Sequence, residues 1–295
     1  AVLIEAGSPR LCRRWVRSRD LDGTIVPMGL PISAENIAAV TRMEGDGVVF
    51  SIATGRSPEA AMGYVKDLPV NGASLFFNGA MLYDCQREQV LGTTALTAEN
   101  PRLWIQFAEK VETSIETTSV EIHTTRGCEI ISEPKYDDPR LIKEFYHVLH
   151  TPLDELCNMK KTPWLKLLIY DTPEHLKEVE QMAVDSGMLF YANMFYSEPT
   201  YLEFVAKNAS KGYALQAIRK MPAYKRKTFL ALGDYLNDLT MMKEADISIA
   251  PANAHDAVKR VADFVACDAR EHLLVWVEQH FSEIVTRIKE KQAIH

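Results

Sequence analysis

The chain has 295 residues, of which 47% are hydrophobic and 25% are charged, and its formal net charge is −7. This composition is typical of a globular protein with one large or two ordinary domains, and the acidic balance argues against nucleic acid as the main partner. No hydrophobic run reaches the length of a membrane span, and the five scattered cysteines form neither a disulfide framework nor a metal-binding CxxC pair. We therefore expect a cytoplasmic protein with reduced thiols and no membrane partner.

The first predicted strand, over residues 14–20, departs from the pattern of a buried strand. Arg17 and Arg19 alternate with other residues directly before Asp20, where a core strand of a parallel sheet is normally a continuous apolar run. Because a buried guanidinium without a partner is costly, we expect this strand to be altered or irregular.

The next segment, Asp20-Leu21-Asp22-Gly23-Thr24, places two carboxylates one residue apart. Alternate side chains of an extended segment share a face, so Asp20 and Asp22 are expected to reach one small site. Like charges at this spacing favour either a metal site or a pair in which one carboxylate attacks and the other carries a proton. Gly23 permits a sharp turn within which Thr24 is expected to hydrogen-bond. The alternative to a functional site is that this segment is only a solvated turn, since Asp-Gly is common in hairpins.

Residues 33–84 alternate helical and strand-like segments. Ser33 and Ser57 are predicted helix N-caps, and Pro58 stands at the first position of the second helix. The predicted elements are a helix over 33–44, a strand over 47–53, a helix from 57 and a strand over 75–77. Strands and helices in this order predict a parallel sheet with right-handed crossovers.

The middle of the chain, about 85–200, has a different rhythm. Its predicted helices cover 97–115, 138–149 and 173–187, and its predicted strands cover 119–124, 128–132, 164–170, 188–195 and 200–205. Pairs of adjacent strands between helices indicate an α+β domain with an antiparallel sheet.

After residue 210 the α/β rhythm returns. The predicted elements are helices over 210–221, 236–245, 254–260 and from 270, and strands over 228–232, 246–250 and 262–265, with Asn253 as a predicted cap for the third of these helices. The simplest architecture is a discontinuous parallel-sheet core, over 1–84 and 201–295, that carries an inserted domain over 85–200.

Four groups of polar residues follow predicted core strands or begin a helix, where open α/β sheets bind ligands. They are residues 20–24, 54–56, 210–212 and 233–238. The Thr54 hydroxyl suits a phosphate oxygen, although helix capping is the favoured explanation when Thr54 is taken alone. Lys211 alone is typical of a solvated lysine. One helix cap needs only one polar side chain, whereas the last group has three: Asp234, Asn237 and Asp238. Three such residues favour a site for a hard cation with oxygen ligands.

In this order, the four groups resemble the motifs of the haloacid dehalogenase-like (HAD) phosphohydrolases, and specifically of the Cof-type branch. DxDGT is matched by 20–24, the Thr-Gly-Arg turn by 54–56, the Lys-Gly pair by 211–212 and GDxxND by 233–238. Phe77-Asn78-Gly79-Ala80 and Tyr201-Leu202-Glu203-Phe204 extend the resemblance over nearly the whole chain. It implies an α/β fold with a Rossmann-like, parallel-sheet HAD core and an inserted α+β cap domain.

The resemblance further implies a phosphatase that acts on small phosphorylated metabolites such as sugar phosphates. Asp20 is the implied nucleophile, which forms an aspartyl-phosphate, and Asp22 is the implied general acid and then base. Asp22 also points to phosphate esters, because dehalogenase members lack an acid at that place. The implied catalytic residues are Asp20, Asp22, Thr54 and Lys211, and the implied substrate contacts are Thr54, Gly55, Arg56, Lys211 and Asn237.

The implied cofactor is Mg²⁺, which prefers oxygen ligands. Carboxylates of Asp20 and Asp234 and the main-chain carbonyl of Asp22 are its implied ligands, with Asp238 supporting them. Asn237 is implied to contact either the phosphate or a metal-bound water.

The cap domain of such enzymes closes over the leaving group and sets specificity. The candidate contacts in this chain are His123, Arg126, Tyr136 and Tyr196. Two other functions are compatible with the motifs: a phosphomutase-type phosphotransferase, which shares the cap type and the aspartyl-phosphate, and a non-catalytic binding protein that keeps the fold.

Overall fold

The computed structural model of the protein describes residues 15–19, 24–25, 32–96, 101–125, 128–130, 148–150 and 163–294. The chain divides into two compact units, the first made of residues 1–92 with 210–295 and the second of 93–209. These divisions fall later than the expected 84/85 and 200/201. The first boundary lies later because β4 (Met81–Asp84) and β5 (Gln89–Thr93) form a sheet with β3 (Ala73–Phe76) of the first unit. The second lies later because β11 (Tyr201–Ala206) pairs with strands of the second unit.

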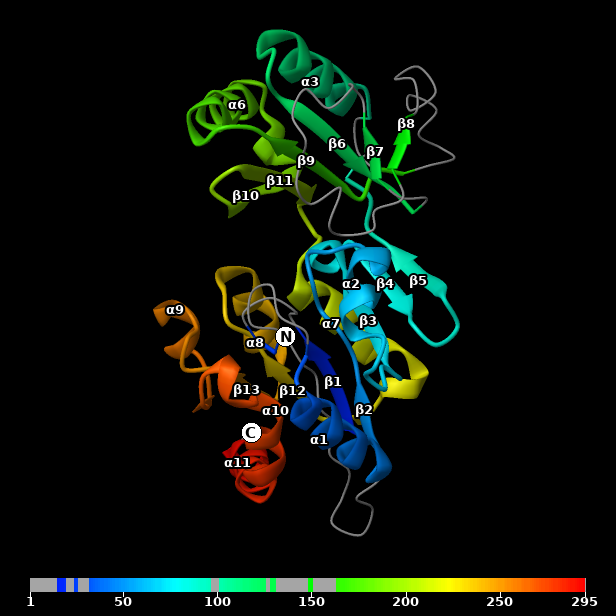
Figure 1. Ribbon diagram of the computed structural model, residues 1–295, viewed down its shortest axis with the longest axis vertical. Coiled ribbons are helices and arrows are strands. Elements are labelled where there is room, and N and C mark those ends of the chain that lie inside the picture. The colour runs from blue at the N-terminus through cyan, green and yellow to red at the C-terminus, as the bar shows by residue number, and fades with distance from the viewer. Residues whose placement is uncertain are drawn as a thin grey trace. The chain divides into compact units, whose positions relative to one another are not determined.

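A five-stranded parallel sheet with the order β14-β13-β12-β1-β2 forms the centre of the first unit (Figure 1). Its strands are β1 (Trp15–Arg19), β2 (Val48–Phe50), β12 (Phe229–Leu232), β13 (Ile247–Ala250) and β14 (Phe264–Val265). Beyond β2 the parallel pairing continues at Ala53, which bridges Leu75 of β3. The predicted parallel α/β core is thereby confirmed.

β1 pairs with both of its neighbours in regular parallel register. Val16 lies opposite Phe229 of β12 on one side and opposite Val49 of β2 on the other. The expectation of an irregular strand is therefore wrong over 15–19, since the hydrogen bonds of a ladder join main-chain groups whatever the side chains are. Asp20 to Gly23, which follow this strand, lie outside the described residues.

Helices flank this sheet, and the predicted N-caps of the first two are confirmed. Ser33 Oγ accepts a hydrogen bond from Asn36 N at the start of α1 (Ala34–Gly45), and Ser57 Oγ accepts one from Ala60 N at the start of α2 (Pro58–Val65). The later helices are α7 (Lys211–Lys220), α8 (Leu239–Glu244), α9 (Asp256–Lys259), α10 (Leu273–Gln279) and α11 (Phe281–Ile294). The single helix expected from 270 is thus two. Within the described ranges, no helix combines the length and apolar composition that crossing a membrane requires.

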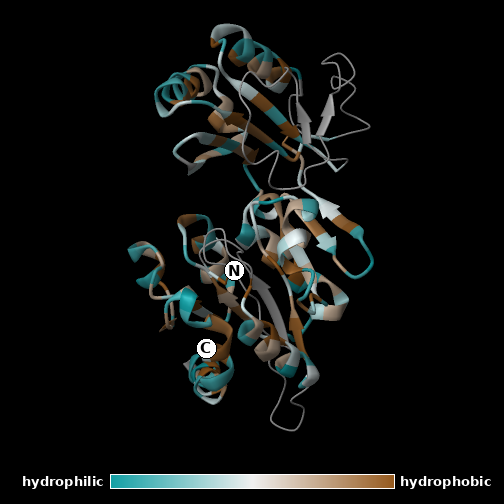
Figure 2. Cartoon of the chain, viewed as in Figure 1, coloured by the Kyte–Doolittle hydropathy of each residue, from teal (hydrophilic) through white to brown (hydrophobic). Residues whose placement is uncertain are grey.

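The core of the first unit is made by the strands and the inner helix faces, as the hydropathy colouring shows (Figure 2). All four residues of β12 and of β13 are buried, as expected for strands covered on both faces. Full burial of a Leu, Ile or Phe side chain stabilises the fold by about 1.5–3 kcal/mol. The continuous apolar runs that predicted these strands therefore also account for much of their stability.

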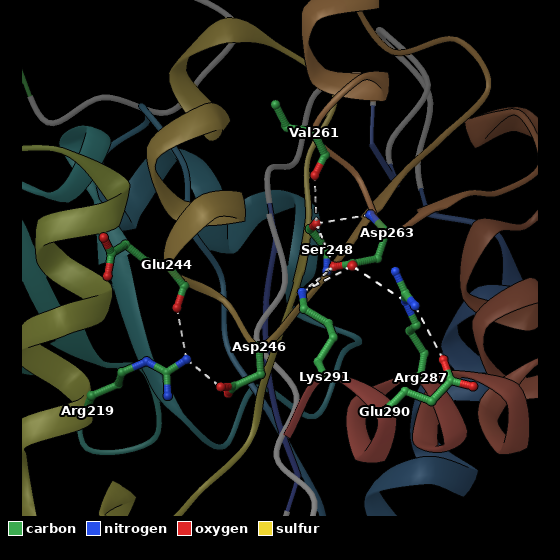
Figure 3. Close-up of polar contacts among 9 residues, drawn as sticks. All are labelled: Arg219, Glu244, Asp246, Ser248, Val261, Asp263, Arg287, Glu290 and Lys291. Atoms are coloured by element: carbon green, nitrogen blue, oxygen red, sulfur yellow. Dashed lines mark hydrogen bonds and ion pairs between the residues drawn. The ribbon is translucent and has the colours of Figure 1, made fainter. Parts of the chain in front are cut away.

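Two aspartates anchor helices near the N-terminal ends of the strands (Figure 3). Asp246, directly before β13, accepts a hydrogen bond from Arg219 of α7 at 2.9 Å. Asp263, directly before β14, accepts hydrogen bonds from Ser248 Oγ at 3.1 Å and from Lys291 of α11 at 3.0 Å. These contacts tie α7 and α11 to the sheet at the end opposite to the carboxyl ends of the strands, where ligand-binding residues are expected.

The second unit is an α+β domain, as predicted, built on a six-stranded sheet with the order β10-β11-β9-β6-β7-β8 (Figure 1). Besides β11, its strands are β6 (Ser119–His123), β7 (Cys128–Ile130), β8 (Val148–His150), β9 (Lys166–Tyr170) and β10 (Ala192–Glu198). All neighbours are antiparallel except β7 and β8. The helices α3 (Pro101–Ser114) and α6 (Pro173–Asp185) pack on one face through residues such as Trp104, Val179 and Phe204.

Two expected elements of this unit differ in the structure. Most of the helix predicted over 138–149 lies outside the described residues, but its last two residues belong to strand β8. The strand predicted over 188–195 begins instead with a 3₁₀ turn, Met188–Phe190, before β10. A short run of apolar residues does not distinguish a strand from a turn, which explains the second difference.

The Asp171 carboxylate, at the end of β9, predicts how stability depends on pH. It accepts hydrogen bonds from the hydroxyls of Thr117 and Thr118 at 2.9 and 2.7 Å and from Thr172 N, and His175 Nδ1 lies 2.9 Å away. Burial raises its pKa, but these hydrogen bonds outweigh burial, so the pKa of Asp171 lies below its usual value.

The stabilisation by ionised Asp171 is therefore fully present above its unfolded-state pKa, about 3.9, and is lost as pH falls through the lower folded-state pKa. We expect Asp171→Asn to lower the free energy of unfolding at pH 7, with a difference from wild type that shrinks below about pH 4. Urea unfolding at a series of pH values tests this, with the exposed Asp185→Asn as control. A difference that is constant from pH 3 to pH 7 would contradict it.

Candidate active site

The predicted site residues within the described ranges follow β2 and β12 or begin α7. Thr54, Gly55 and Arg56 lie between β2 and α2, Lys211 is the first residue of α7, and residues 234–238 follow β12. Because the carboxyl ends of parallel strands meet at one edge of a sheet, these segments converge there. Asp20 and Asp22 lie outside the described residues, so their predicted roles stay predictions.

A buried ion pair joins α7 to the segment after β12. Lys211 Nζ donates to Asp238 Oδ1 at 2.7 Å, and neither side chain is exposed. The other oxygen, Asp238 Oδ2, accepts hydrogen bonds from the main-chain N–H groups of Asp234 and Tyr235, at 3.0 and 3.2 Å. Burial raises the pKa of Asp238, but the Lys211 ammonium and the Tyr235 N–H donor hold that pKa below its usual value.

Gly233 allows this carboxylate to approach the main chain. A Cβ at Gly233 would lie 2.5 Å from Asp238 Cβ, closer than real Cβ contacts occur. The Gly-Asp pair therefore forms a tight turn in which the side chain of Asp238 caps the main chain of Asp234. Lys211 is thus not the solvated lysine that its position in the sequence allows, because the turn supplies it with a buried partner.

The Asp234 carboxylate is oriented by a residue far away in sequence. Thr24 is fully buried, and its hydroxyl donates to Asp234 Oδ1 at 2.6 Å. The parallel pairing of β1 with β12 brings these two segments together. The hydrogen bond that we expected Thr24 to make within its own turn involves residues 20–23, which lie outside the described residues, and stays a prediction. Hydroxyl-to-carboxylate bonds of this length are strong and hold the carboxylate in one orientation.

The turn over 54–56 is held by its own main chain and by β3. Thr54 N donates to Leu75 O at 2.9 Å, and Thr54 Oγ1, which is buried, accepts a hydrogen bond from Arg56 N at 3.2 Å. The Arg56 guanidinium lies over the ring of Tyr64, 4.8 Å from its centre, in a cation–π contact. Thr54 therefore caps the turn locally, as the alternative interpretation held, while it lies at the predicted phosphate-binding edge.

Asn78, for which the sequence predicted no role in the site, connects two of the predicted segments. Its side-chain Oδ1 accepts a hydrogen bond from Asn237 Nδ2 at 3.1 Å, and its main-chain N donates to Thr54 O at 2.9 Å. The signal in the sequence was present, because an Asn-Gly pair directly after a strand marks a turn with left-handed backbone. What the pattern did not reveal was the partner of the carboxamide.

The described part of the predicted metal-binding set is Asp234 and Asp238. Among the described residues, no group of three His, Cys, Asp or Glu side chains lies close enough to hold a metal ion by itself. Asp234, half-buried and oriented by Thr24, has the chemistry of an Mg²⁺ ligand. Both oxygens of Asp238 already accept hydrogen bonds from protein donors, which favours a supporting role over direct coordination.

Of the four candidate contacts in the second unit, Arg126 and Tyr136 lie outside the described residues. Tyr196 lies opposite Leu202, on the helix-covered face of the sheet, and its hydroxyl donates to Glu180 of α6 at 2.9 Å. Burial and this hydrogen bond raise the pKa of Tyr196 to about 12. The contact with α6 indicates a scaffold role for Tyr196.

His123 lies on the other face of that sheet, in a buried group of ionisable side chains. His123 Nε2 is 3.3 Å from Glu121 Oε2, and Lys166 Nζ is 3.3 Å from Glu203 Oε1. The strand register places all four on one face. Burying charges is costly unless they are paired, and here each carboxylate lies beside a basic group. The structure therefore does not bring His123 and Tyr196 together.

Asn253 was predicted to cap the helix that follows it, and this prediction is wrong. Its Oδ1 accepts a hydrogen bond from Ala269 N at 2.8 Å, whereas His255 caps α9. The loop that enters α9 is thus anchored by Asn253 to the segment before α10, a contact that local sequence does not reveal.

Comparison with known proteins agrees with this geometry. Residues 18–275 match the family described as haloacid dehalogenase-like hydrolase. A curated relative is 5-amino-6-(5-phospho-D-ribitylamino)uracil phosphatase YcsE of Bacillus subtilis, 25% identical over 248 residues, which cover 83% of this chain and 87% of YcsE.

Solved structures show the same fold along nearly the whole chain. A haloacid dehalogenase-like hydrolase from Bacteroides thetaiotaomicron is 25% identical, with a TM-score of 0.74 over 90% of this chain and 98% of that one. The HAD subclass IIB sugar phosphatase BT4131 is 22% identical, with a TM-score of 0.71 over 90% and 98% of the two chains. The resemblance that the four motifs indicated is confirmed: the chain belongs to the haloacid dehalogenase-like hydrolases.

Proposed function

We propose that this hydrolase is an Mg²⁺-dependent phosphatase of small phosphomonoesters, such as sugar phosphates, that works through an aspartyl-phosphate on Asp20. The observation that carries the proposal is the buried Lys211–Asp238 pair beside Asp234, at the carboxyl edge of a parallel sheet. Phosphoryl transfer gains mainly from positioning and charge neutralisation, and this edge offers both. The names of the relatives, a phosphatase of a ribityl phosphate and a sugar phosphatase, agree with such substrates.

In the proposed reaction the Asp20 carboxylate attacks phosphorus, the bond from phosphorus to the ester oxygen breaks, and Asp22 gives its proton to the departing alcohol. Asp22 then takes a proton from a water molecule, which attacks the aspartyl-phosphate and releases inorganic phosphate and the free Asp20 carboxylate. Lys211 and Thr54 bind the phosphoryl oxygens, while Asp238 holds the Lys211 ammonium in place through the bond of 2.7 Å.

Mg²⁺ would be held by Asp20, Asp234 and the main-chain carbonyl of Asp22, and when bound it neutralises phosphoryl charge. The orientation of Asp234 by the buried Thr24 hydroxyl supports this assignment. Asp238 acts on the same site indirectly, because it fixes the main chain of Asp234 and the ammonium of Lys211. We further propose that residues 93–209 form the domain that selects the substrate. The cytoplasmic location stays a prediction.

The test is hydrolysis of p-nitrophenyl phosphate and of a panel of sugar phosphates, with Mg²⁺ and with EDTA. We expect release of inorganic phosphate that requires Mg²⁺ and is lost in Asp20→Asn, while the exposed Asp46→Asn serves as control and stays active. Hydrolysis that survives Asp20→Asn would contradict the nucleophile. Isomerised sugar phosphate in place of free phosphate would identify a phosphomutase, and no reaction with any ester would favour a binding protein.

A further inference from the structure

The chain makes an unusual bend directly after β3. Phe77, Asn78 and Gly79 have consecutive positive φ angles of 51°, 54° and 96°. Left-handed backbone is unfavourable for residues other than glycine, and two such residues in succession, here Phe77 and Asn78, persist only where the surroundings hold them. A Cβ at Gly79 would lie 2.3 Å from Ser210 O, so the bend presses the main chain against the residue that precedes Lys211.

This bend buries the carboxamide of Asn78 between two segments of the site. Asn78 is 6% exposed, its side-chain Oδ1 accepts the hydrogen bond from Asn237 Nδ2, and its main-chain N donates to Thr54 O. The same carboxamide lies against Gly55, where a Cβ would be 3.0 Å from Asn78 Nδ2. One residue therefore contacts the turn over 54–56 and the segment after β12 at the same time.

The hydrogen bond also determines what Asn237 presents to the site. With Nδ2 bonded to Asn78, the plane of the Asn237 carboxamide is fixed, and Oδ1 points the other way. That Oδ1 is buried and accepts no hydrogen bond from any described residue. Buried acceptors are normally satisfied, so this oxygen suits a donor that the described residues do not supply, such as a water molecule or a protonated phosphate oxygen.

We propose that Asn78 is a positioning residue that fixes Asn237 relative to the turn over 54–56, so that both segments act on the same phosphoryl group. The proposal rests on the proposed function and adds a residue to it. Asn78 does not itself touch the substrate; it acts through the Asn237 carboxamide and through the main chain of Thr54. The alternative is that Asn78 serves only to form the turn, because asparagine tolerates left-handed backbone better than most residues.

Replacement of Asn78 with glycine separates these two roles. Asn78→Gly keeps the left-handed backbone, which glycine adopts without strain, and removes only the carboxamide. Arg226→Gly is a matched control, because Arg226 is also a non-glycine residue with positive φ, at 67°, but is exposed and lies outside the predicted motifs. Asn237→Ala and the double variant Asn78→Gly/Asn237→Ala complete a double-mutant cycle.

The measurements are kcat/KM for p-nitrophenyl phosphate and the affinity for inorganic phosphate by titration calorimetry. We expect Asn78→Gly and Asn237→Ala each to lower kcat/KM and to weaken phosphate binding by about 10-fold or more, as loss of an orienting contact does. The double variant should be no worse than either single variant, because both changes break one interaction. Arg226→Gly should stay within twofold of wild type.

Independent effects that multiply in the double variant, or an Asn78→Gly variant within twofold of wild type, would overturn the positioning role. A loss that Arg226→Gly reproduces would assign the effect to the backbone instead. An inactive wild-type protein would refute the proposed phosphatase, whereas the phosphate-binding cycle would still decide the role of Asn78.

Discussion

Lys211→Met is expected to lower the free energy of unfolding by about 3–5 kcal/mol and to remove most phosphatase activity. Lys211 Nζ and Asp238 Oδ1 are 2.7 Å apart, and both side chains are fully buried. Methionine fills a similar volume but leaves the Asp238 carboxylate buried without its cation, which is costlier than the loss of the ion pair itself. Urea-induced unfolding and hydrolysis of p-nitrophenyl phosphate measure the two effects.

A second change separates stability from activity. In Lys211→Met/Asp238→Leu no uncompensated charge remains, so we expect part of the stability to return while activity stays lost. Lys291→Met is the matched control, because Lys291 pairs with Asp263 at 3.0 Å in the same unit but is 38% exposed. Exposed pairs contribute about 0–1 kcal/mol, so a similar loss of stability in both single variants would contradict the importance of burial.

Asp234→Asn is expected to lower phosphatase activity by about 1,000-fold or more, since a bound metal ion contributes several kcal/mol to the transition state. The amide has the shape of the carboxylate but lacks the charge that would hold Mg²⁺. The hydrogen bond from the buried Thr24 hydroxyl to Oδ1 can persist, so we expect the fold to remain. Activity as a function of Mg²⁺ concentration, with unfolding measured in parallel, tests this prediction.

Thr24→Val gives a graded version of the same experiment. It removes the hydrogen bond of 2.6 Å that orients Asp234 while it keeps the size of the side chain. Loss of such an orienting partner typically weakens metal binding by about 10–100-fold, so the Mg²⁺ concentration for half-maximal activity should rise by that factor. Thr41→Val, on the exposed side of α1, is the control.

Mg²⁺-dependent hydrolysis of Asp234→Asn within tenfold of wild type would exclude Asp234 as a ligand.

Local signals were sufficient for much of the fold. Ser33 and Ser57 act as N-caps because a cap depends only on the few residues that follow it. The strands of the core were predicted because a strand buried on both faces must be apolar throughout, as β12 is. The one strand that broke this pattern, β1, led to a wrong expectation, because main-chain pairing with β12 and β2 is regular.

The partners of the site residues were not predictable in the same way. Thr24 donates to Asp234, a partner that its local sequence did not indicate, and Asn253 was expected to cap a helix but binds Ala269 N. In each case a short polar side chain has several possible partners, and its neighbours in sequence are only some of them. The choice depends on which segments the sheet brings together.

The sequence by itself determined the class of the molecule: a parallel α/β core with an inserted α+β domain, and four motifs whose order identifies a haloacid dehalogenase-like hydrolase. Only the tertiary structure decided how those motifs cooperate, with Lys211 on Asp238, Thr24 on Asp234 and Asn78 on Asn237. The physical reason is the range of the interactions. Hydrophobic periodicity and helix capping act within one or two turns of chain, whereas each of these hydrogen bonds joins segments that meet only after the sheet has formed.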